Sequence, residues 1–296
     1  MRLALVVNPR SGKGRAAGAA DITQRRLESA GVSVRRLQGA DGDDAARLCR
    51  EAVADGVDAV VAVGGDGMAH LALQACAGTP TALGIVPTGT GNDLARALSL
   101  PVGDPSASAD LLAAGAIRVV DAVRTAGQWW ACVLGVGFDG AVNDRANRMR
   151  WPRGRRRYDL AVVAELRTYR PTRFVLTLDD DRVEVDAMLV AVGNAPSYGG
   201  GMKVCPDAIL DDGLLDVVVV GPLSRTRFLR LFPRVFAGTH VRDPSVTVRR
   251  ARHVVIDGPP SATAYADGER IGTPPLSCAL QPGALRVLGV PQGDVA

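Results

Sequence analysis

The sequence predicts an α/β protein, with an N-terminal doubly wound parallel-sheet domain followed by a C-terminal antiparallel β-sandwich-like domain. Over residues 1–124, short apolar strands alternate with helical patterns, which is typical of a parallel sheet. Glycine-rich loops follow three of these strands. Over residues 125–288, short β-rich runs between Gly, Pro and Asp-Gly turns favour an antiparallel sandwich or curled sheet. The C-terminal tail, about 289–296, is a candidate for completing the first domain.

The N-terminal elements are expected where apolar runs and turn residues alternate. Strands are predicted at Arg2–Val7, Val32–Leu37, Asp58–Val63, Ala82–Val86 and Ile117–Val123. Helices are predicted at about Arg15–Ala30, Ala45–Asp55, Met68–Ala77, a short segment ending at Leu98, and about Ser106–Ala114. Asp43 or Asp44 is the expected N-cap of the second helix, because a cap carboxylate accepts N–H groups of the first turn. This spacing predicts a sheet with helices on both faces.

The C-terminal elements begin with two helical stretches, at about Ala141–Met149 and Tyr158–Tyr169. Strands are then predicted at Phe174–Leu178, Val183–Val192, Leu214–Val220, Val246–Val248, His253–Ile256, Thr263–Ala266 and Leu285–Leu288. One more helix is expected near Arg225–Phe236. We find no internal repeat or low-complexity linker, so we expect the two domains to meet at a tight boundary with a cleft between them.

Length and composition are ordinary for a soluble enzyme with two cores: 296 residues, 47% of them hydrophobic and 22% charged. No apolar run reaches the ~18–20 residues that span a bilayer, and we see no signal-peptide pattern. Five cysteines without Cys-x-x-Cys spacing favour reduced thiols. The three histidines lie far apart, which argues against a histidine-based metal site. We therefore expect a cytoplasmic protein.

Positive charge gathers in one segment of the chain. The formal net charge is only +4, yet seven arginines and no acid lie between Arg145 and Arg157. The cluster fits a solvated helix face, a contact with an anionic membrane surface, or a nucleic-acid patch. Aromatic residues are sparse, so a stacking surface for single strands is poorly supported and no nucleic-acid partner is expected. Peripheral membrane contact through this segment is a hypothesis motivated by its charge, and a homodimer stays open.

Three loops should converge at the carboxyl edge of the first sheet, where doubly wound proteins bind ligands. They are Asn8–Gly14, Gly64–Gly67 and Thr88–Asp93. Together they offer glycine backbone, hydroxyl groups, two basic side chains and two acids. That inventory suits a nucleoside triphosphate with its metal ion, although each loop alone is compatible with a tight turn that binds nothing. The first loop lacks the Gly-x4-Gly-Lys spacing of a Walker A loop.

The loops resemble those of the diacylglycerol kinase catalytic domain family, which includes bacterial lipid kinases and sphingosine kinases. The matching motifs are Asn-Pro-x-Ser-Gly from Asn8, Gly-Gly-Asp-Gly from Gly64 and Gly-Thr-Gly-Asn-Asp from Gly89. Later motifs match in the same order: Val120-Asp121, Gly137-Phe138-Asp139, Pro206–Leu214 and Ala266–Glu269. The resemblance therefore covers almost the whole chain.

The resemblance implies the roles of particular residues. It assigns ATP binding to Asn8, Pro9, Arg10, Ser11, Gly12, Gly64, Gly65, Asp66, Gly67, Met68 and Thr90. It assigns Asp66, Asp93 and Asp121 to the network that holds the nucleotide's Mg²⁺ and its waters. Glu269 matches the general base that takes the proton of the lipid hydroxyl. A second, structural magnesium is implied at Asp212, with the main-chain carbonyls of Ile209 and Leu214.

Some positions depart from the family pattern. Met68, His70 and Leu71 stand where threonine, asparagine and glutamate are usual, and a threonine often found before the second helix is absent near Gly39. At these positions the sequence therefore lacks a hydroxyl and an amide that the family usually has beside the phosphates. The segment Gly135–Gly140 spells Gly-x-Gly-x-x-Gly, but it opens the second domain, and no acid-tipped strand follows at about 20 residues. We interpret it as a packing turn.

We therefore expect an ATP- and Mg²⁺-dependent lipid kinase, with an ATP-binding domain at 1–124 and a lipid-substrate domain at 125–288. Diacylglycerol, converted to phosphatidic acid, is the default acceptor, which would place the chain in phospholipid biosynthesis. One alternative is a soluble-substrate kinase of the nicotinamide dinucleotide kinase type. The other is a catalytically silent lipid- or nucleotide-binding protein, which Met68 and His70 keep open.

Overall fold

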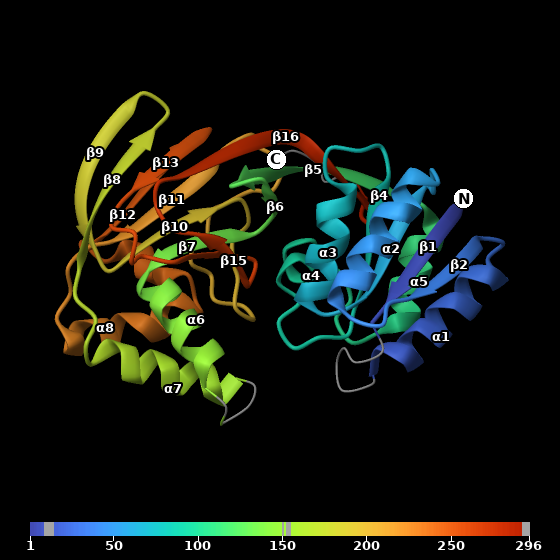
Figure 1. Ribbon diagram of the computed structural model, residues 1–296, viewed down its shortest axis with the longest axis horizontal. Helices are drawn as coiled ribbons and strands as arrows, with labels where there is room; N and C mark the ends of the chain where they lie inside the picture. The colour runs from blue at the N-terminus through green and yellow to red at the C-terminus, as the bar shows by residue number, and fades with distance from the viewer. Residues whose placement is uncertain (9–14, 150, 152–154, 292–296) are drawn as a thin grey trace.

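The computed structural model describes residues 1–8, 15–149, 151 and 155–291, with the side chains of 155–159 left aside. An N-terminal α/β domain and a C-terminal β-rich domain lie side by side (Figure 1). Strands of one continuous sheet run from one domain to the other along one edge of the molecule.

The N-terminal domain contains four parallel strands in the order β2-β1-β3-β4. Their bounds are Arg2–Val7 (β1), Ser33–Gln38 (β2), Ala59–Gly64 (β3) and Ala82–Pro87 (β4). Every residue of β3 and β4 is buried, because helices cover both faces of the sheet. This arrangement confirms the predicted doubly wound sheet.

The helices of this domain divide between the two faces. Helices α1 (Arg15–Ser29) and α5 (Pro105–Ala114) share a core with the side chains of Leu3, Leu5 and Val61. Helices α2 (Gly42–Ala54) and α3 (Asp66–Cys76), with the short α4 (Asp93–Ala97), pack against the opposite face. The alternation of apolar side chains along each strand produces these two cores.

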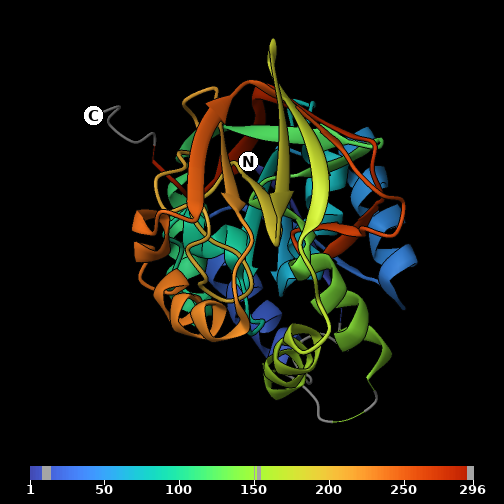
Figure 2. The same ribbon diagram turned by 90° about the vertical axis from the view of Figure 1, so that its left-hand side faces the viewer.

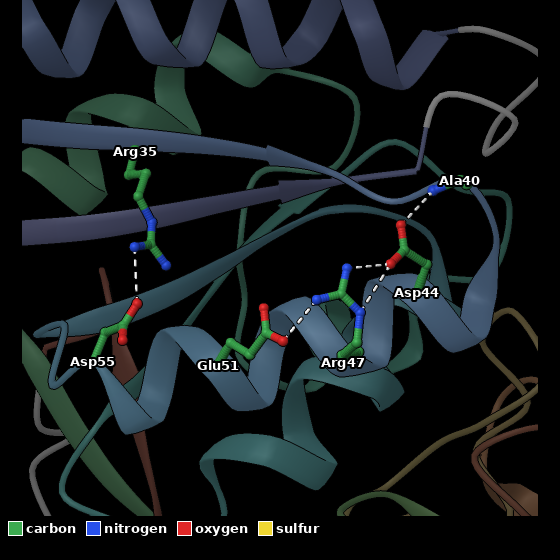
Figure 3. A network of polar contacts seen from close by, with 6 residues as sticks. All are labelled: Arg35, Ala40, Asp44, Arg47, Glu51 and Asp55. Carbon is green, nitrogen blue, oxygen red and sulfur yellow. Dashed lines mark hydrogen bonds and ion pairs between the residues drawn. The ribbon is translucent and has the colours of Figure 1, made fainter.

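The start of α2 differs from the sequence expectation. Its N-cap is Asp41, whose carboxylate accepts the N–H of Asp44, so the helix begins three residues before Ala45. Asp44 lies inside the first turn and accepts the N–H of Ala40, which gives a reciprocal pair of caps. Figure 3 shows this contact and the surface ion pairs of Arg47 along the helix. The prediction of Asp43 or Asp44 as the N-cap is therefore wrong, because the helix begins earlier and places both of these residues in its first turn.

One long strand joins the two domains. Strand β16 (Leu276–Leu288) pairs with β13 (His253–Asp257) at its start, with β5 (Ile117–Thr125) along its length, and with β4 at Val287, opposite Leu83. The prediction of a strand at Leu285–Leu288 caught only its last four residues, because Pro282 and Gly283 interrupt the apolar pattern. The end of β16 thus extends the first sheet, while residues 292–296 of the expected tail lie outside the described structure.

The C-terminal domain is a sandwich of two antiparallel layers, as predicted. The first layer is the continuation of the first sheet through β16, β13 (His253–Asp257), β8 (Thr172–Leu178) and β9 (Asp181–Ala187), with β5 and β6 (Gln128–Trp130) beside it. The second layer has the order β12-β11-β10-β7-β14-β15. Its strands are Val246–Ala251 (β12), Leu215–Val220 (β11), Leu189–Gly193 (β10), Val133–Gly137 (β7), Ala264–Ala266 (β14) and Glu269–Gly272 (β15). Leu134, Phe174 and Ile256 belong to the core between the layers.

The predicted strand Val183–Val192 is in fact two strands in two different sheets. Strand β9 ends at Ala187, and β10 begins at Leu189 on the other layer. Met188 connects them, and its N–H donates to the carbonyl of Val220. The apolar run passes from one layer to the other without Gly or Pro, so no turn signal marks the change.

Helices lie at one end of this sandwich (Figure 2). They are α6 (Phe138–Arg148), α7 (Arg155–Leu166), α8 (Arg225–Leu231) and the 3₁₀ turns Phe232–Val235 and Thr239–Arg242. The helix expected over Arg225–Phe236 therefore changes to a 3₁₀ turn at Phe232, where Pro233 lacks an N–H for an α-helical bond. Across the part of the chain described, no helix is long and apolar enough to cross a membrane, and all five cysteines are buried and free.

The Gly-x-Gly-x-x-Gly segment packs rather than forming an open loop. It runs from β7 into α6, and a Cβ at Gly140 would lie 1.8 Å from the carbonyl oxygen of Thr263 in the neighbouring backbone. Gly140→Ala should therefore lower the free energy of unfolding by at least about 1–3 kcal/mol, because the backbone cannot yield as a side chain can.

Urea unfolding monitored by circular dichroism measures this loss. Gly18→Ala is the matched control, since its added methyl group meets nothing within 4 Å on α1 and should leave stability equal or higher. Equal stability of Gly140→Ala and the native protein would contradict the packing interpretation.

Candidate active site

Two of the glycine loops meet backbone to backbone at the carboxyl edge of the first sheet. A Cβ at Gly89 would lie 2.5 Å from the Cα of Gly65, so neither loop could approach the other with a side chain there. A Cβ at Gly91 would lie 2.4 Å from Oδ2 of Asp66. Close approach therefore requires glycine at these positions.

Asp66 holds the second loop in place. As the first residue of α3, it accepts the backbone N–H groups of Asn92 (2.8 Å) and Asp93 (2.6 Å). Asn92 is left-handed, with φ of 55°, and its side chain bonds the N–H and carbonyl of Gly89. The two predicted acids, Asp66 and Asp93, are thus brought together by main-chain hydrogen bonds.

Asp93 connects the two domains. Its carboxylate accepts the N–H groups of Gly199 (2.6 Å) and Gly200 (2.8 Å), which belong to a loop of the C-terminal domain. The side chain is buried, and the pKa of Asp93 is raised by that burial first and by the charge of Asp66 second. The negative charges of Asp66 and Asp93 therefore destabilise each other, which favours the binding of a cation nearby.

Glu269 is positioned by a tight hairpin turn. Asp267 and Gly268, both with positive φ, connect β14 to β15, as in the primed turns of two-residue hairpins. The carboxylate of Asp267 accepts the N–H groups of Ala131, Cys132 and Val133 at 2.8–3.2 Å, which fastens the turn to the start of β7. Glu269, the first residue of β15, is exposed, and within the described residues its carboxylate has no hydrogen bond or ion pair.

An open groove separates Glu269 from the start of α3. Its lining includes Asn8, Gly65 and Gly67 from the N-terminal domain, and Glu269 and Arg270 from the C-terminal domain. The free volume of this groove is about 480 Å³, large enough for a substrate group. The predicted base and the predicted phosphate-binding loop therefore face a common space.

A smaller cavity lies behind this groove. It is lined by Asp66, Asp93, Asp267 and Cys132, and His70 borders both the cavity and the groove. His70 is buried, its Nδ1 has no hydrogen-bond partner, and burial lowers its pKa, although the charge of Glu269 raises it. The imidazole is therefore neutral at pH 7, with a polar atom available for a ligand or water.

The remaining predicted ATP-binding residues are only partly described. Pro9, Arg10, Ser11 and Gly12 lie outside the described residues. Thr90 is exposed beside the loop, whereas the side chain of Met68 is buried in the domain core. The hydroxyl of Thr88, one of those that the loops were expected to offer, is buried and has no hydrogen-bond partner among the described residues.

Asp121 lies apart from the groove. Its carboxylate accepts the N–H groups of Gly283 in β16 and Gly213 in the loop before β11, both at 2.8 Å. The N–H of Asp121 donates to the carbonyl of Leu210. The geometry gives this acid a connecting role between β5, β16 and that loop, and its role around a nucleotide stays a prediction.

The residues expected around a second magnesium are close in sequence but already engaged. Oδ1 of Asp212 accepts the N–H of Leu214, and Oδ2 pairs with the guanidinium of Arg250, which also bonds the buried Asp216. Ile209 is half exposed. Arg250 thus supplies positive charge where the resemblance implies a metal ion, so the residues present do not favour this site.

The first acid pair fits a magnesium–nucleotide complex better. Mg²⁺ in nucleotide sites is held by one or two carboxylates, with phosphate oxygens and waters completing its shell. The oxygens of Asp66 and Asp93 already accept backbone N–H groups, but neither carboxylate makes an ion pair with a basic side chain of the described structure. Their remaining lone pairs could bind a cation, which would relieve the mutual repulsion of the two charges. Among the described residues, no group of three or more His, Cys, Asp or Glu side chains forms a complete metal cage.

A separate apolar cavity lies among the helices of the C-terminal domain. Its polar lining consists of Asp139, Tyr198 and His240. The other lining residues are apolar: Phe138, Val162, Leu189, Met202, Val204, Val220, Phe228, Leu231, Phe232 and Val235. Asp139, which the sequence places in the Gly-x-Gly segment, is therefore a buried carboxylate at an apolar site.

Comparisons with known proteins agree with this architecture. Residues 2–125 match the family described as the diacylglycerol kinase catalytic domain, and residues 132–289 match the YegS C-terminal NAD kinase beta sandwich-like domain. A diacylglycerol kinase of Mycobacterium tuberculosis is 44% identical over 293 residues, covering 97% of this chain and 94% of the relative. A diacylglycerol kinase of Bacillus subtilis is 28% identical over 93% of this chain and 91% of the relative.

A solved structure has the same fold. The crystal structure of a diacylglycerol kinase from Bacillus anthracis aligns with a TM-score of 0.75 over 97% of this chain and 96% of that chain, at 22% sequence identity. Both domains and their connection are therefore shared with that protein.

The buried Asp267 should make stability depend on pH. Its pKa is raised from the ordinary 3.8 to about 6, by burial first and against the three N–H donors. Ionisation of Asp267 therefore opposes folding. The contribution of the protonated side chain to the free energy of unfolding is fully present below about pH 4 and is lost as the pH rises to about 6. Asp267→Asn has no proton to lose, so the native protein should lose roughly 2–3 kcal/mol of stability relative to this variant as the pH rises from about 4 to about 6.

The stability of the native protein relative to Asp267→Asn should fall as the pH rises through this interval and then level off. Urea unfolding at several pH values measures it, with the exposed Asp186→Asn as a control that shows no such trend. A constant difference would contradict the raised pKa.

Proposed function

The chain belongs to the diacylglycerol kinase family, and from this premise we propose that it phosphorylates a lipid hydroxyl with ATP and Mg²⁺, converting diacylglycerol to phosphatidic acid. The single observation that carries the proposal is the groove in which Glu269 faces the glycine-bordered start of α3. A kinase needs a phosphate site and a base on opposite sides of one space, and this groove provides both.

The N-terminal wall of the groove suits the phosphates of ATP. Helix α3 has a glycine, Gly65, as its N-cap, with no side-chain cap hydrogen bond, and its first turn borders the groove through Gly67 and Met68. The N-terminal end of a helix favours a negatively charged group such as phosphate. Gly67 adds no side chain that would obstruct a phosphate. Mg²⁺, held by Asp66 and Asp93, would neutralise phosphate charge during transfer.

The opposite wall supplies the base. The lipid hydroxyl oxygen bonds to the γ-phosphorus as the bond from that phosphorus to the bridging oxygen breaks, and ADP leaves with that oxygen. The proton of the hydroxyl passes to the carboxylate of Glu269. Because Asp267 fixes the turn by accepting three N–H groups, Glu269 is held at the groove without structural hydrogen bonds of its own carboxylate among the described residues.

His70 accounts for one departure from the family pattern. A neutral imidazole at the border of the groove can exchange one hydrogen bond with a phosphate or a water, as the usual asparagine would. Met68 points into the core, so it contributes only its backbone to the phosphate site. These substitutions are therefore compatible with ATP binding.

The apolar cavity beside α6 and α8 is suited to an acyl chain of the acceptor. Its free volume is only about 50 Å³, which is room for one or two water-sized groups, so side chains must move to admit a chain. Asp139 offers a hydrogen-bond acceptor for a polar group at the head of that chain. This arrangement supports a lipid acceptor over a soluble nucleotide.

Glu269→Gln should reduce kcat for phosphoryl transfer by about 10²–10⁴-fold, because the amide cannot accept the proton. The assay follows labelled phosphate from ATP into diacylglycerol in mixed vesicles, with ATP binding measured separately. ATP affinity should be unchanged, and the exposed Glu184→Gln on β9 should behave as the native protein. Full activity in Glu269→Gln would refute the assigned base.

The same assay separates the alternative functions. Transfer to a soluble acceptor but to no lipid would favour the soluble-substrate kinase, and neither transfer nor ATP binding would favour the silent binder.

Filling the cavity tests the acyl-chain assignment. Met202→Trp should lower kcat/KM for long-chain diacylglycerol about tenfold or more, while a short-chain acceptor is phosphorylated as before, because only the long chain needs the cavity. Ile22→Trp, on the exposed face of α1, is the matched control. An equal loss for both acceptors would place the acyl chain elsewhere.

A further inference from the structure

The helical end of the C-terminal domain exposes apolar side chains. Leu160 and Val163 in α7 are 47% and 50% exposed, and Leu229 in α8 is 53% exposed. Trp151, which precedes α7, is 80% exposed. Figures 1 and 2 both place α7 and α8 at the end of the domain opposite the tip of the β8–β9 hairpin. Large apolar side chains gathered at one end of a protein mark an interaction surface.

Arginines surround these side chains without acids to pair them. Helix α8 contains three arginines and no acid. Arg225 and Arg230 in α8, and Arg148 at the end of α6, are exposed and make no ion pair with any residue that the structure describes. Two acids of this region whose side chains are described already have partners, Glu165 in Arg145 and Asp243 in Arg227. We name the arginines Arg148, Arg225 and Arg230, with the apolar residues Trp151, Leu160, Val163 and Leu229, the α7–α8 face.

Positive charge is concentrated in the part of the sequence between the end of α6 and the start of α7. The segment from Arg145 to Arg157 carries seven positive charges against a formal net charge of +4, so the remainder of the chain is net negative by three (4 − 7 = −3). An anionic partner would therefore approach this end of the molecule.

The combination of side chains identifies the partner as a lipid bilayer. Trp, Leu and Val beside Arg are the residues with which interfacial helices enter the boundary between head groups and acyl chains. A nucleic acid would leave the exposed leucines and valine in water, and a second copy would bring two arginine clusters together. Only an anionic bilayer satisfies the apolar and the basic side chains at once.

The same helices line the apolar cavity from inside. Val162 of α7 and Phe228 and Leu231 of α8 border the cavity, next in sequence to the exposed Val163 and Leu229. A bilayer in contact with the α7–α8 face would thus lie one helix thickness from the cavity. An acyl chain could enter between the helices without crossing water.

We propose that the α7–α8 face docks this protein on bilayers that contain anionic phospholipid and admits the acceptor to the cavity from the membrane. The admission of an acceptor lipid rests on the proposed function, whereas docking on the bilayer requires neither ATP nor catalysis. Binding and phosphoryl transfer are therefore measured separately.

Vesicle sedimentation without nucleotide tests the docking. Vesicles of equal parts phosphatidylcholine and phosphatidylglycerol are compared with vesicles of phosphatidylcholine alone. The double variant Arg225→Gln/Arg230→Gln should bind the anionic vesicles about 10–30-fold more weakly, with a smaller dependence on salt. Leu160→Gln/Val163→Gln should weaken binding to both kinds of vesicle. Ile22→Gln/Arg25→Gln, on the exposed face of α1, is the matched control and should bind as the native protein.

Native-like binding by both test variants, equal loss in the α1 control, or indifference to anionic lipid would each overturn the proposal. Dimerisation lost in the same variants, with vesicle binding unchanged, would assign the face to a second copy and also overturn it. Circular dichroism confirms that each variant is folded, and the two test variants alter different side chains, so a misfolded one leaves the other decisive. Vesicle binding as expected, but with no transfer to any acceptor, would support docking and refute the proposed function instead.

Discussion

Hydrogen bonds from backbone N–H groups to buried and half-buried aspartates hold this structure together. Asp66 joins the two glycine loops, Asp93 joins the domains, Asp121 joins β5 to β16, and Asp267 holds the turn before Glu269. Burying a carboxylate is costly unless several donors surround it, and each of these accepts at least two. The donors come from segments whose N–H groups would otherwise be unpaired. Each hydrogen bond therefore satisfies both the carboxylate and the backbone of the segment that donates to it.

This constraint explains how two acids separated by one residue differ. In Asp267-Gly268-Glu269, the turn directs Asp267 toward the start of β7 and leaves Glu269 facing the groove. The first carboxylate is fully occupied by the fold, and the second is left without partners in the described structure. A general base needs both a fixed position and free oxygens. Asp267 fixes the position of the turn, and Glu269 keeps its oxygens free.

Much of the fold could be predicted from the sequence, because strand runs and helix periodicity are local. Strands β1 to β4 and the helices between them were found to within a few residues, and Glu269 faces the expected loop. The partners of the buried acids could not be predicted in the same way. Asp121 bonds Gly213 and Gly283, 92 and 162 residues away, and a glycine N–H has no signature in a sequence. The change of layer at Met188 and the length of β16 escaped prediction for the same reason, since each depends on distant pairing.

The place of β16 in the first sheet affects how the protein is made. Strand β4 pairs in parallel with β3 on one side and, on the other, with β16, where Val287 lies opposite Leu83 although 204 residues separate them in sequence (287 − 83 = 204). During synthesis this edge of β4 therefore stays unpaired until β16 has been made. Such edges recruit other strands, and pairing across this distance in sequence closes slowly. Until β16 is in place, this free edge of β4 is a site at which nascent chains can associate with one another.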